Sequence, residues 1–285
     1  MDATGAFALI FFATLFAFNQ VVVKVTNDGF GPVFQAGLRS LGAIPVMLLW
    51  MWFRGIRIST PRAAVLGGIL SGLLFAVEFL LLFTALDLTT VSRASVIFYS
   101  MPVWLTIAAH FLLPGETFTR KRGIGLVLAM GGVILALADR GGGAASLTGD
   151  LLALGGAMCW AGIALTVRMT PLGGVKPEVQ LLWQICISAP ILLLLAPVFG
   201  DLLRVPTAMH WAGLGFQIVC IATLGFLLWF VLLARYPASS VASFSFLSPV
   251  LAVLLGWGLL DEPIRPAIWV ALGLVAVGLV LINRK

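Results

Sequence analysis

The sequence contains few charged residues for its length. Asp, Glu, Lys and Arg together make up 10% of the 285 residues, whereas hydrophobic residues make up 61% and the mean hydropathy is +1.12. Soluble globular domains typically contain about 25% charged residues. This composition argues against a soluble enzyme and predicts a protein whose main solvent is the lipid bilayer.

Cysteine and histidine are also scarce, which argues against several kinds of site. Cys159, Cys186 and Cys220 all fall inside apolar stretches, so neither a disulfide framework nor a CxxC metal site is expected. His110 and His210 lie at opposite faces of the expected bundle, and two histidines cannot assemble a metal cluster. We therefore expect no metal, heme or other cofactor.

Ten apolar stretches are expected to cross the membrane as helices, because a hydrocarbon core of about 30 Å requires about 20 residues per helix. Short connectors join them and hold most of the charges. The first stretch has no basic residue before it and no clear cleavage site, so we expect a retained helix instead of a signal peptide. The expected spans are residues 5–25, 32–53, 63–86, 92–113, 123–138, 149–170, 178–198, 209–234, 238–260 and 265–282.

The two halves of the chain repeat each other when one is shifted by about 145 residues. The matched pairs, in chain order, are Phe16 with Trp160, Lys24 with Arg168, Pro45 with Pro190, Ser92 with Ser239, Tyr99 with Phe246, and Pro102 with Pro249. Each half holds five spans, an odd number, so the second half enters the membrane from the opposite side. The sequence thus predicts an all-α membrane protein with ten transmembrane helices in two inverted five-helix repeats, residues 1–140 and 148–285, joined by a linker at 141–147.

Short motifs recur around the fourth and ninth spans. The first half reads Thr-Ala-Leu at 84–86, Val-Ser-Arg-Ala-Ser at 91–95, Pro-Val at 102–103 and Gly-Glu at 115–116, and the second half reads Leu-Ala at 233–234, Ser-Ser-Val-Ala at 239–242, Pro-Val at 249–250 and Asp-Glu-Pro at 261–263. Over nearly the whole chain the sequence resembles the drug/metabolite transporter superfamily, specifically its EamA-type exporters, although the first half departs where a Trp-Gly pair is usual. The resemblance implies export of amino acids or related metabolites, with aromatic amino-acid exporters among the nearest relatives.

The fourth span carries a stripe of polar residues and proline on one helical face, and the ninth span repeats it. We predict that these two stripes line a substrate cavity between the repeats, whereas the fifth and tenth spans, without polar mid-helix residues, lie at the periphery. Alternatively, the hydroxyls bond to carbonyls of their own helix or hold helices together. The stripes consist of Ser92, Ser95, Tyr99, Pro102 and Thr106 in the fourth span, and Ser239, Ser243, Phe246 and Pro249 in the ninth.

Other spans contribute further candidates for the cavity. Asn19 and Gln20 are placed to contact an amino-acid carboxylate or amino group, and Trp160 either stacks on an apolar substrate or packs in the core. Pro102 and Pro249 interrupt the helical hydrogen bonding of their spans. Their bends either open the cavity or serve only packing.

Glu78 is the acidic residue that lies deep inside an expected span, and such a group is a candidate functional site. Arg39 lies at a matching depth in the second span, so we expect the two charges to form an ion pair. Proton exchange by Glu78 during transport is the alternative that the sequence leaves open.

These features predict a secondary transporter that exports amino acids or related small metabolites by alternating access. Its partners would be a small-molecule substrate and the lipid bilayer, with no nucleic acid, and the oligomeric state is left open between monomer and homodimer. A cation- or proton-coupled drug or nucleotide-sugar antiporter is the alternative, although a phosphate-bearing substrate needs several buried cations. A channel or a membrane-embedded enzyme is less favoured, because pore-lining charges and a converging catalytic set are both scarce.

Positive charges predict the orientation in the plasma membrane, expected to be a bacterial inner membrane. Eleven Lys and Arg residues fall in one set of alternate connectors and five in the other, which favours both termini in the cytoplasm and an external linker near Gly141. A cysteine introduced at Ala144 should therefore react with a reagent added outside intact cells. Labelling that occurs only in permeabilised cells would show that the orientation is reversed.

Overall fold

The computed structural model describes residues 3–113, 119–139, 146–225, 228 and 247–283. Within these ranges the regular structure is helical, apart from an isolated bridge between Phe30 and Leu203. The helices are α1 (Ala3–Asn27), α2 (Pro32–Phe53), α3 (Arg62–Leu88), α4 (Val91–Phe98), α5 (Met101–Leu112), α6 (Arg120–Ala138), α7 (Leu147–Met169), η1 (Pro171–Gly174), α8 (Pro177–Leu195), η2 (Ala196–Val198), α9 (Ala208–Phe216), η3 (Gln217–Gly225), α12 (Leu247–Leu260) and α13 (Pro266–Asn283).

The structure confirms an all-helical membrane protein with ten transmembrane helices. Eight helical segments in the described ranges are long and apolar enough to cross a bilayer, and α12 and α13 are two shorter apolar helices. Three of the spans combine two elements each, since α4 is followed by α5, α8 by η2 and α9 by η3. The predicted end of the eighth span and start of the ninth fall largely outside the described residues.

The outer surface of the bundle is apolar, as a lipid-facing surface must be. Leu66 in α3, Val127 in α6 and Leu194 in α8 expose 76%, 73% and 78% of their surface. Soluble monomers rarely expose large contiguous apolar patches, whereas lipid chains cover such a surface at no cost. Hydrophobic residues therefore lie on both sides of each helix, toward the core and toward the bilayer.

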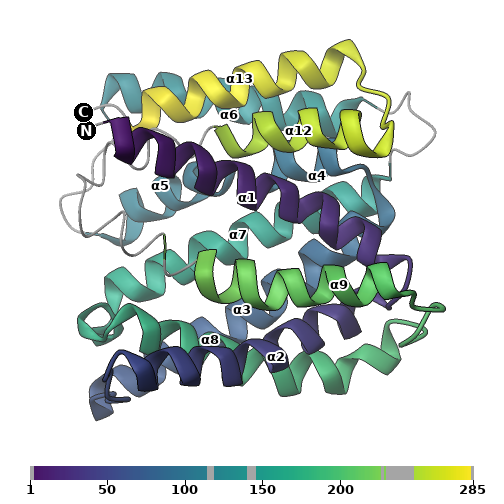
Figure 1. Cartoon of the computed structure of the whole chain (residues 1–285). Coiled ribbons are helices and arrows are strands. Elements are labelled where there is room, and N and C mark those ends of the chain that lie inside the picture. Colours follow the sequence, from purple (N-terminus) through teal and green to yellow (C-terminus); the bar gives the residue numbers. More distant parts are fainter. Residues whose placement is uncertain (1–2, 114–118, 140–145, 226–227, 229–246, 284–285) are drawn as a thin grey trace.

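The helices are arranged in layers between two paired edges (Figure 1). Along one edge α6 packs against α13, and along the opposite edge α2 packs against α8. The remaining spans lie between these pairs, so the fifth and tenth spans are peripheral, as predicted.

The packing of the helices follows the repeat. The contact of α1 with α12 has its counterpart in the contact of α7 with α4 and α5, and the contact of α2 with η3 has its counterpart in that of α8 with α3. The three pairs α6 with α13, α2 with α8 and α4 with α12 each join equivalent spans of the two halves. Most of the extensive helix contacts thus run between the repeats and not within one of them.

Glycines allow α6 and α13 to approach closely. A Cβ atom at Gly132 would lie 2.6 Å from the backbone oxygen of Ala271, and one at Gly278 would lie 2.6 Å from that of Gly125. Small residues at such crossings let helix backbones pack without a side chain between them. Gly131, the neighbour of Gly132, has nothing within 4 Å of the corresponding position.

The different surroundings of Gly131 and Gly132 predict that the same substitution at the two positions affects stability differently. Gly132→Ala should lower the melting temperature in detergent, because overpacking costs about 1–3 kcal/mol and the contact atom belongs to backbone that cannot rotate away. Gly131→Ala is the control and should leave stability unchanged or slightly raised, since alanine is the better helix former. Equal melting temperatures for the two variants would contradict the close α6–α13 contact.

Candidate functional site

A buried polar cluster joins three central spans from both repeats. Tyr99 ends α4 and is 8% exposed, and its hydroxyl lies within hydrogen-bonding reach of Gln20 in α1 and Ser248 in α12. A phenol buried in the membrane needs polar partners, and these two side chains supply them. The structure thus brings the predicted residues Tyr99 and Gln20 together and adds Ser248, which the sequence analysis did not single out.

Aromatic rings extend this cluster toward α7. The rings of Phe98 and Trp160 stack with centroids 5.1 Å apart and planes inclined by 17°, and Trp160 also meets Tyr99 edge to face at 6.2 Å. Trp160 is only half-buried, so part of its ring remains open for another contact. Both roles that the sequence allowed for Trp160, packing and stacking on a substrate, are compatible with this position.

The fourth span is broken next to this cluster. Helix α4 ends at Phe98 with Tyr99 as its C-cap, α5 starts at Met101, and the hydroxyl of Ser100 donates to the carbonyl of Ile97 at 2.6 Å. Pro102 therefore sits at the start of a second helix, where its missing N–H costs least, and not in the middle of a continuous one. Its repeat counterpart Pro249 is buried in the first turn of the described part of α12.

The polar stripe of the fourth span divides into residues with and without partners. The hydroxyl of Ser92 donates to Glu262 at 3.1 Å, and that of Thr106 donates to the carbonyl of Pro102 at 2.6 Å. The hydroxyl of Ser95 is buried and has no hydrogen-bond partner among the described residues. The equivalent candidates of the ninth span, Ser239, Ser243 and Phe246, lie outside the residues that the structure describes.

Arg39 and Glu78 are both buried, but they do not form the expected ion pair. Within the described part of the chain no ion pair joins them, and Arg39 Nη1 and Glu78 Oε2 lack hydrogen-bond partners. The Arg39 guanidinium instead lies over the ring of Phe79, 4.3 Å from its centroid. Matching depth in the membrane did not fix the direction in which each side chain leaves its helix.

Asn19 and Gln20 are buried as well, and each has a side-chain oxygen without a partner in the described residues.

A second polar region lies where the α3–α4 connector meets the second repeat. Arg93 in α4 donates to both carboxylate oxygens of Asp150 in α7, the shortest distance being 2.6 Å, and to the carbonyl of Ala136 at 2.5 Å. Asp150 also accepts a hydrogen bond from Thr89. The sequence analysis missed this pair because Arg93 and Asp150 each fall at the very start of an expected span.

Glu262 binds the beginning of α4 from the α12–α13 connector. Its carboxylate accepts hydrogen bonds from the backbone N–H groups of Val91 at 2.7 Å and Ser92 at 3.1 Å. A carboxylate at a helix N-terminus satisfies otherwise unpaired N–H groups and is favoured by the helix dipole. Glu262 belongs to a motif that the sequence analysis used only for the resemblance. The available signal was an acidic side chain in the short connector between the ninth and tenth expected spans.

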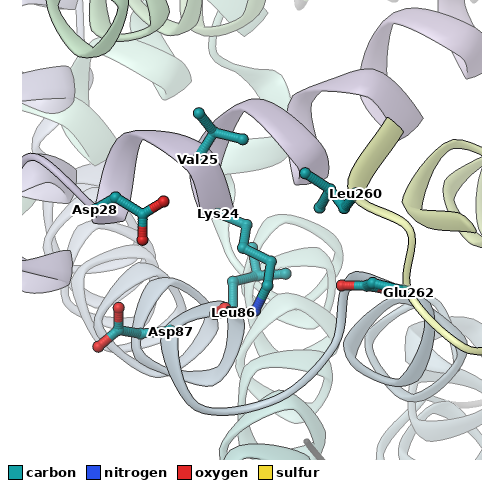
Figure 2. A pocket seen from close by; sticks show the side chains of 7 residues that line it. All are labelled: Lys24, Val25, Asp28, Leu86, Asp87, Leu260 and Glu262. Carbon is teal, nitrogen blue, oxygen red and sulfur yellow. Dashed lines mark hydrogen bonds between the residues drawn. The ribbon is translucent and has the colours of Figure 1, made fainter. Parts of the chain in front are cut away.

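A pocket of about 210 Å³ lies beside this contact (Figure 2). Lys24 extends from α1 into it and donates to the carbonyls of Leu86 at 2.9 Å and Thr89 at 2.7 Å. At its edge Arg204 donates two hydrogen bonds to Asp87, which raise the pKa of the Arg204 guanidinium above its ordinary value. The pocket is lined by Lys24, Val25, Asp28, Leu86, Asp87, Leu260 and Glu262.

Another polar link connects α1, α2 and η3. Gln35 donates to Gln217 at 3.2 Å, and Gln217 in turn donates to Thr26 at 3.4 Å. Gln217 opens the π-helical segment η3, a rare conformation that occurs frequently at functional sites. Nothing in the sequence pattern signalled this segment, because a π-helix has the same apolar composition as an α-helix.

Comparison with known proteins supports the transporter interpretation. The model of the EamA-like transporter family matches residues 3–138 and again residues 147–284, in agreement with two repeats. "Uncharacterized transporter YvbV" of Bacillus subtilis is 28% identical over 98% of this chain and 92% of its own. "Uncharacterized inner membrane transporter YedA" of Escherichia coli is 23% identical over 92% of this chain and 85% of its own.

A solved structure shares the fold. One crystal structure is 21% identical and superimposes with a TM-score of 0.66 over 99% of this chain and 96% of that chain. At this identity the likeness concerns the fold alone. The two family matches cover almost all of the sequence, and the ten-helix architecture agrees with them. The chain belongs to the EamA-like transporter family.

Proposed function

We propose that this membrane transporter exports amino acids or related small metabolites by alternating access, with the substrate held at the interface of the two repeats. The observation that supports this most directly is the cluster of Gln20, Tyr99 and Ser248, to which both repeats contribute buried polar groups. Transporters built from inverted repeats place their substrates at such a junction near the middle of the membrane. We place the protein in the bacterial inner membrane with both termini in the cytoplasm.

The buried charges favour a neutral or zwitterionic substrate over a phosphate-bearing one. Binding a phosphate in the membrane requires several cations that are free to pair with it. Arg93 is already paired with Asp150, and Lys24 is already bound by two backbone carbonyls. The aromatic rings of Phe98, Tyr99 and Trp160 would pack against the apolar part of an amino acid.

Alternating access requires one end of the molecule to open, and the contacts of Glu262 are placed to hold the expected outer end closed. Glu262 belongs to the second repeat and the bound N–H groups of Val91 and Ser92 belong to the first. The Arg93–Asp150 pair crosses between the repeats in the same region. If the repeats rock against each other, these contacts must separate during each cycle.

Glu262→Gln should favour opening of this end, because a hydrogen bond to a charged acceptor contributes about 1.5–3 kcal/mol. A loss of this size corresponds to about a tenfold or larger shift in population. A cysteine at Ser95, in a background with Cys159, Cys186 and Cys220 replaced by alanine, should then react at least about ten times faster with an impermeant reagent from the outer side.

Asp261→Asn is the matched control for this experiment, since it removes the same charge from the neighbouring residue. Asp261 is exposed and has a positive φ of 50°, which asparagine tolerates well. Equal labelling rates for the two variants would argue against a gate at Glu262.

Transport itself can be tested with purified protein in liposomes and a panel of labelled amino acids, with and without a pH gradient. We expect saturable flux of at least one amino acid. Ser95→Phe should abolish this flux without reducing expression, because its bulky ring would occupy the region beside the unpartnered Ser95 hydroxyl. The control Ser59→Phe changes an exposed connector residue and should transport normally. Absence of flux for every amino acid would contradict the proposed substrate class.

A further inference from the structure

Two ionisable side chains of opposite type are buried in the membrane, and the described part of the chain provides neither with a hydrogen-bond partner. Arg39 in α2 is 4% exposed and Glu78 in α3 is 5% exposed. Over the ranges that the structure describes, neither side chain makes a hydrogen bond or an ion pair. A buried charge is strongly unfavourable unless it is paired and hydrogen-bonded, so this arrangement calls for a partner other than the described residues.

Aromatic rings contact the guanidinium of Arg39, and its N–H groups make no hydrogen bond to the residues that the structure describes. Arg39 Cζ lies 4.3 Å from the centroid of Phe79 and 5.7 Å from that of Phe83. A cation–π contact engages the flat face of a guanidinium, whereas its N–H groups point outward in the plane. The geometry therefore orients Arg39 while keeping its planar fork available, and such a fork matches a carboxylate.

Glu78 provides the opposite charge nearby without neutralising Arg39 directly. It directly precedes Phe79 in α3, and each of the two charges acts electrostatically on the other. Successive helical residues point about 100° apart, so Glu78 leaves α3 in a different direction from the ring that holds Arg39. Among the described residues, a guanidinium and a carboxyl group thus lie near each other, and each has at least one atom without a hydrogen-bond partner.

A ligand with a single charge does not satisfy this arrangement. An anion would pair with Arg39 and leave Glu78 buried and unpaired, and a cation would do the converse. A ligand that carries a carboxylate and an ammonium on the same carbon satisfies both, and the site as a whole remains neutral. This combination of groups is the head group of an α-amino acid.

We propose that Arg39 and Glu78 are the head-group site of this transporter, Arg39 binding the carboxylate and Glu78 the ammonium of a zwitterionic α-amino acid. The inference rests on the proposed function, because it assigns the substrate class of that same transporter. Its consequence is selectivity by charge pattern, so that amines, organic acids and blocked amino acids are rejected even where their side chains fit.

The surroundings of Glu78 connect this site with the aromatic cluster. A Cβ atom at Gly156 in α7 would lie 3.3 Å from the ring of Phe98 and 3.6 Å from the backbone oxygen of Glu78, so both pack on the same glycine. Phe98 stacks on Trp160 of α7. The thiol of Cys159, also in α7, lies close enough to Glu78 to interact with it electrostatically. The side chain of an amino acid bound at Glu78 would thus meet apolar and aromatic surface.

The wild-type protein can test this charge pattern by itself. Liposomes would be loaded with an amino acid that the panel identifies as transported, and three competitors with the same side chain would be compared: the amino acid, its amide and its N-acetyl derivative. The amide lacks the carboxylate and the N-acetyl compound lacks the ammonium. We expect each derivative to compete at least about 30-fold more weakly, as losing one partner of a buried charge pair predicts.

Variants of Arg39 and Glu78 test which residue binds the carboxylate and which binds the ammonium of the amino acid. Arg39→Gln should remove the preference for the amino acid over its amide, and Glu78→Gln should remove the preference over the N-acetyl derivative. Arg39→Lys and Glu78→Asp keep the charges and should keep both preferences in weakened form. Asp261→Asn serves as the control for the loss of one negative charge, because Asp261 is exposed in the α12–α13 connector. Ligand-induced shifts in melting temperature provide a second readout that does not depend on flux.

The outcomes separate this inference from the proposed function. Flux of an amino acid with equal competition by all three compounds would overturn the head-group site and leave the proposed function intact. Variants that fold and discriminate as the wild type does would also overturn it, because Arg39 and Glu78 would then be structural. If the variants do not fold, the wild-type competition series still decides the matter. Absence of flux and of thermal shift with every amino acid would refute both proposals together.

Discussion

The buried ion pair between Arg93 and Asp150 is the contact on which the arrangement of the two repeats depends most strongly. A buried pair is stable only when its remaining donors and acceptors are also satisfied. Here Arg93 additionally donates to the carbonyl of Ala136, and Asp150 accepts from Thr89. One salt bridge thereby fixes the positions of α4 and α7 and of the end of α6. The same pair positions the start of α4, to which Glu262 binds from the other side.

The polar groups inside the bundle fall into two kinds that differ in their partners. Near the α3–α4 connector the charges are satisfied by defined protein atoms, which join the two repeats in the conformation that the structure shows. Toward the middle of the membrane, atoms of Asn19, Arg39, Glu78 and Ser95 are buried without partners in the described part of the chain. Unsatisfied groups are expensive in lipid, so they are retained where a ligand or a second conformation satisfies them. The contrast distinguishes an end at which the repeats are joined from a central region whose polar groups are available to the proposed substrate.

Hydrophobic length was enough to place the ten spans, because the thickness of the bilayer fixes how many apolar residues each helix needs. Repeated motifs likewise indicated the two-repeat fold, and the family matches agree with it. The direction in which a buried side chain points could not be predicted from the sequence pattern. Arg39 and Glu78 lie in neighbouring helices as expected, yet Phe79 and not Glu78 holds the guanidinium. Asp150 was missed because an acid near a helix end has the same sequence signature whether it is solvated or buried. The break after Tyr99 could not be predicted either. Pro102 alone predicts a bend, but not that one helix ends at Phe98 and a second begins at Met101.

The distribution of helix contacts has a consequence for how the protein is made. Because α6 finds its main partner in α13, α2 in α8 and α1 in α12, the first five helices have few extensive contacts with one another. They emerge from the ribosome and enter the membrane first, at a stage when their partners have not been synthesised. Until translation is complete, their glycine-lined and polar faces are open to lipid, to other nascent helices and to the quality-control machinery of the cell. Chain completion is thus the event that commits the first half to its structure.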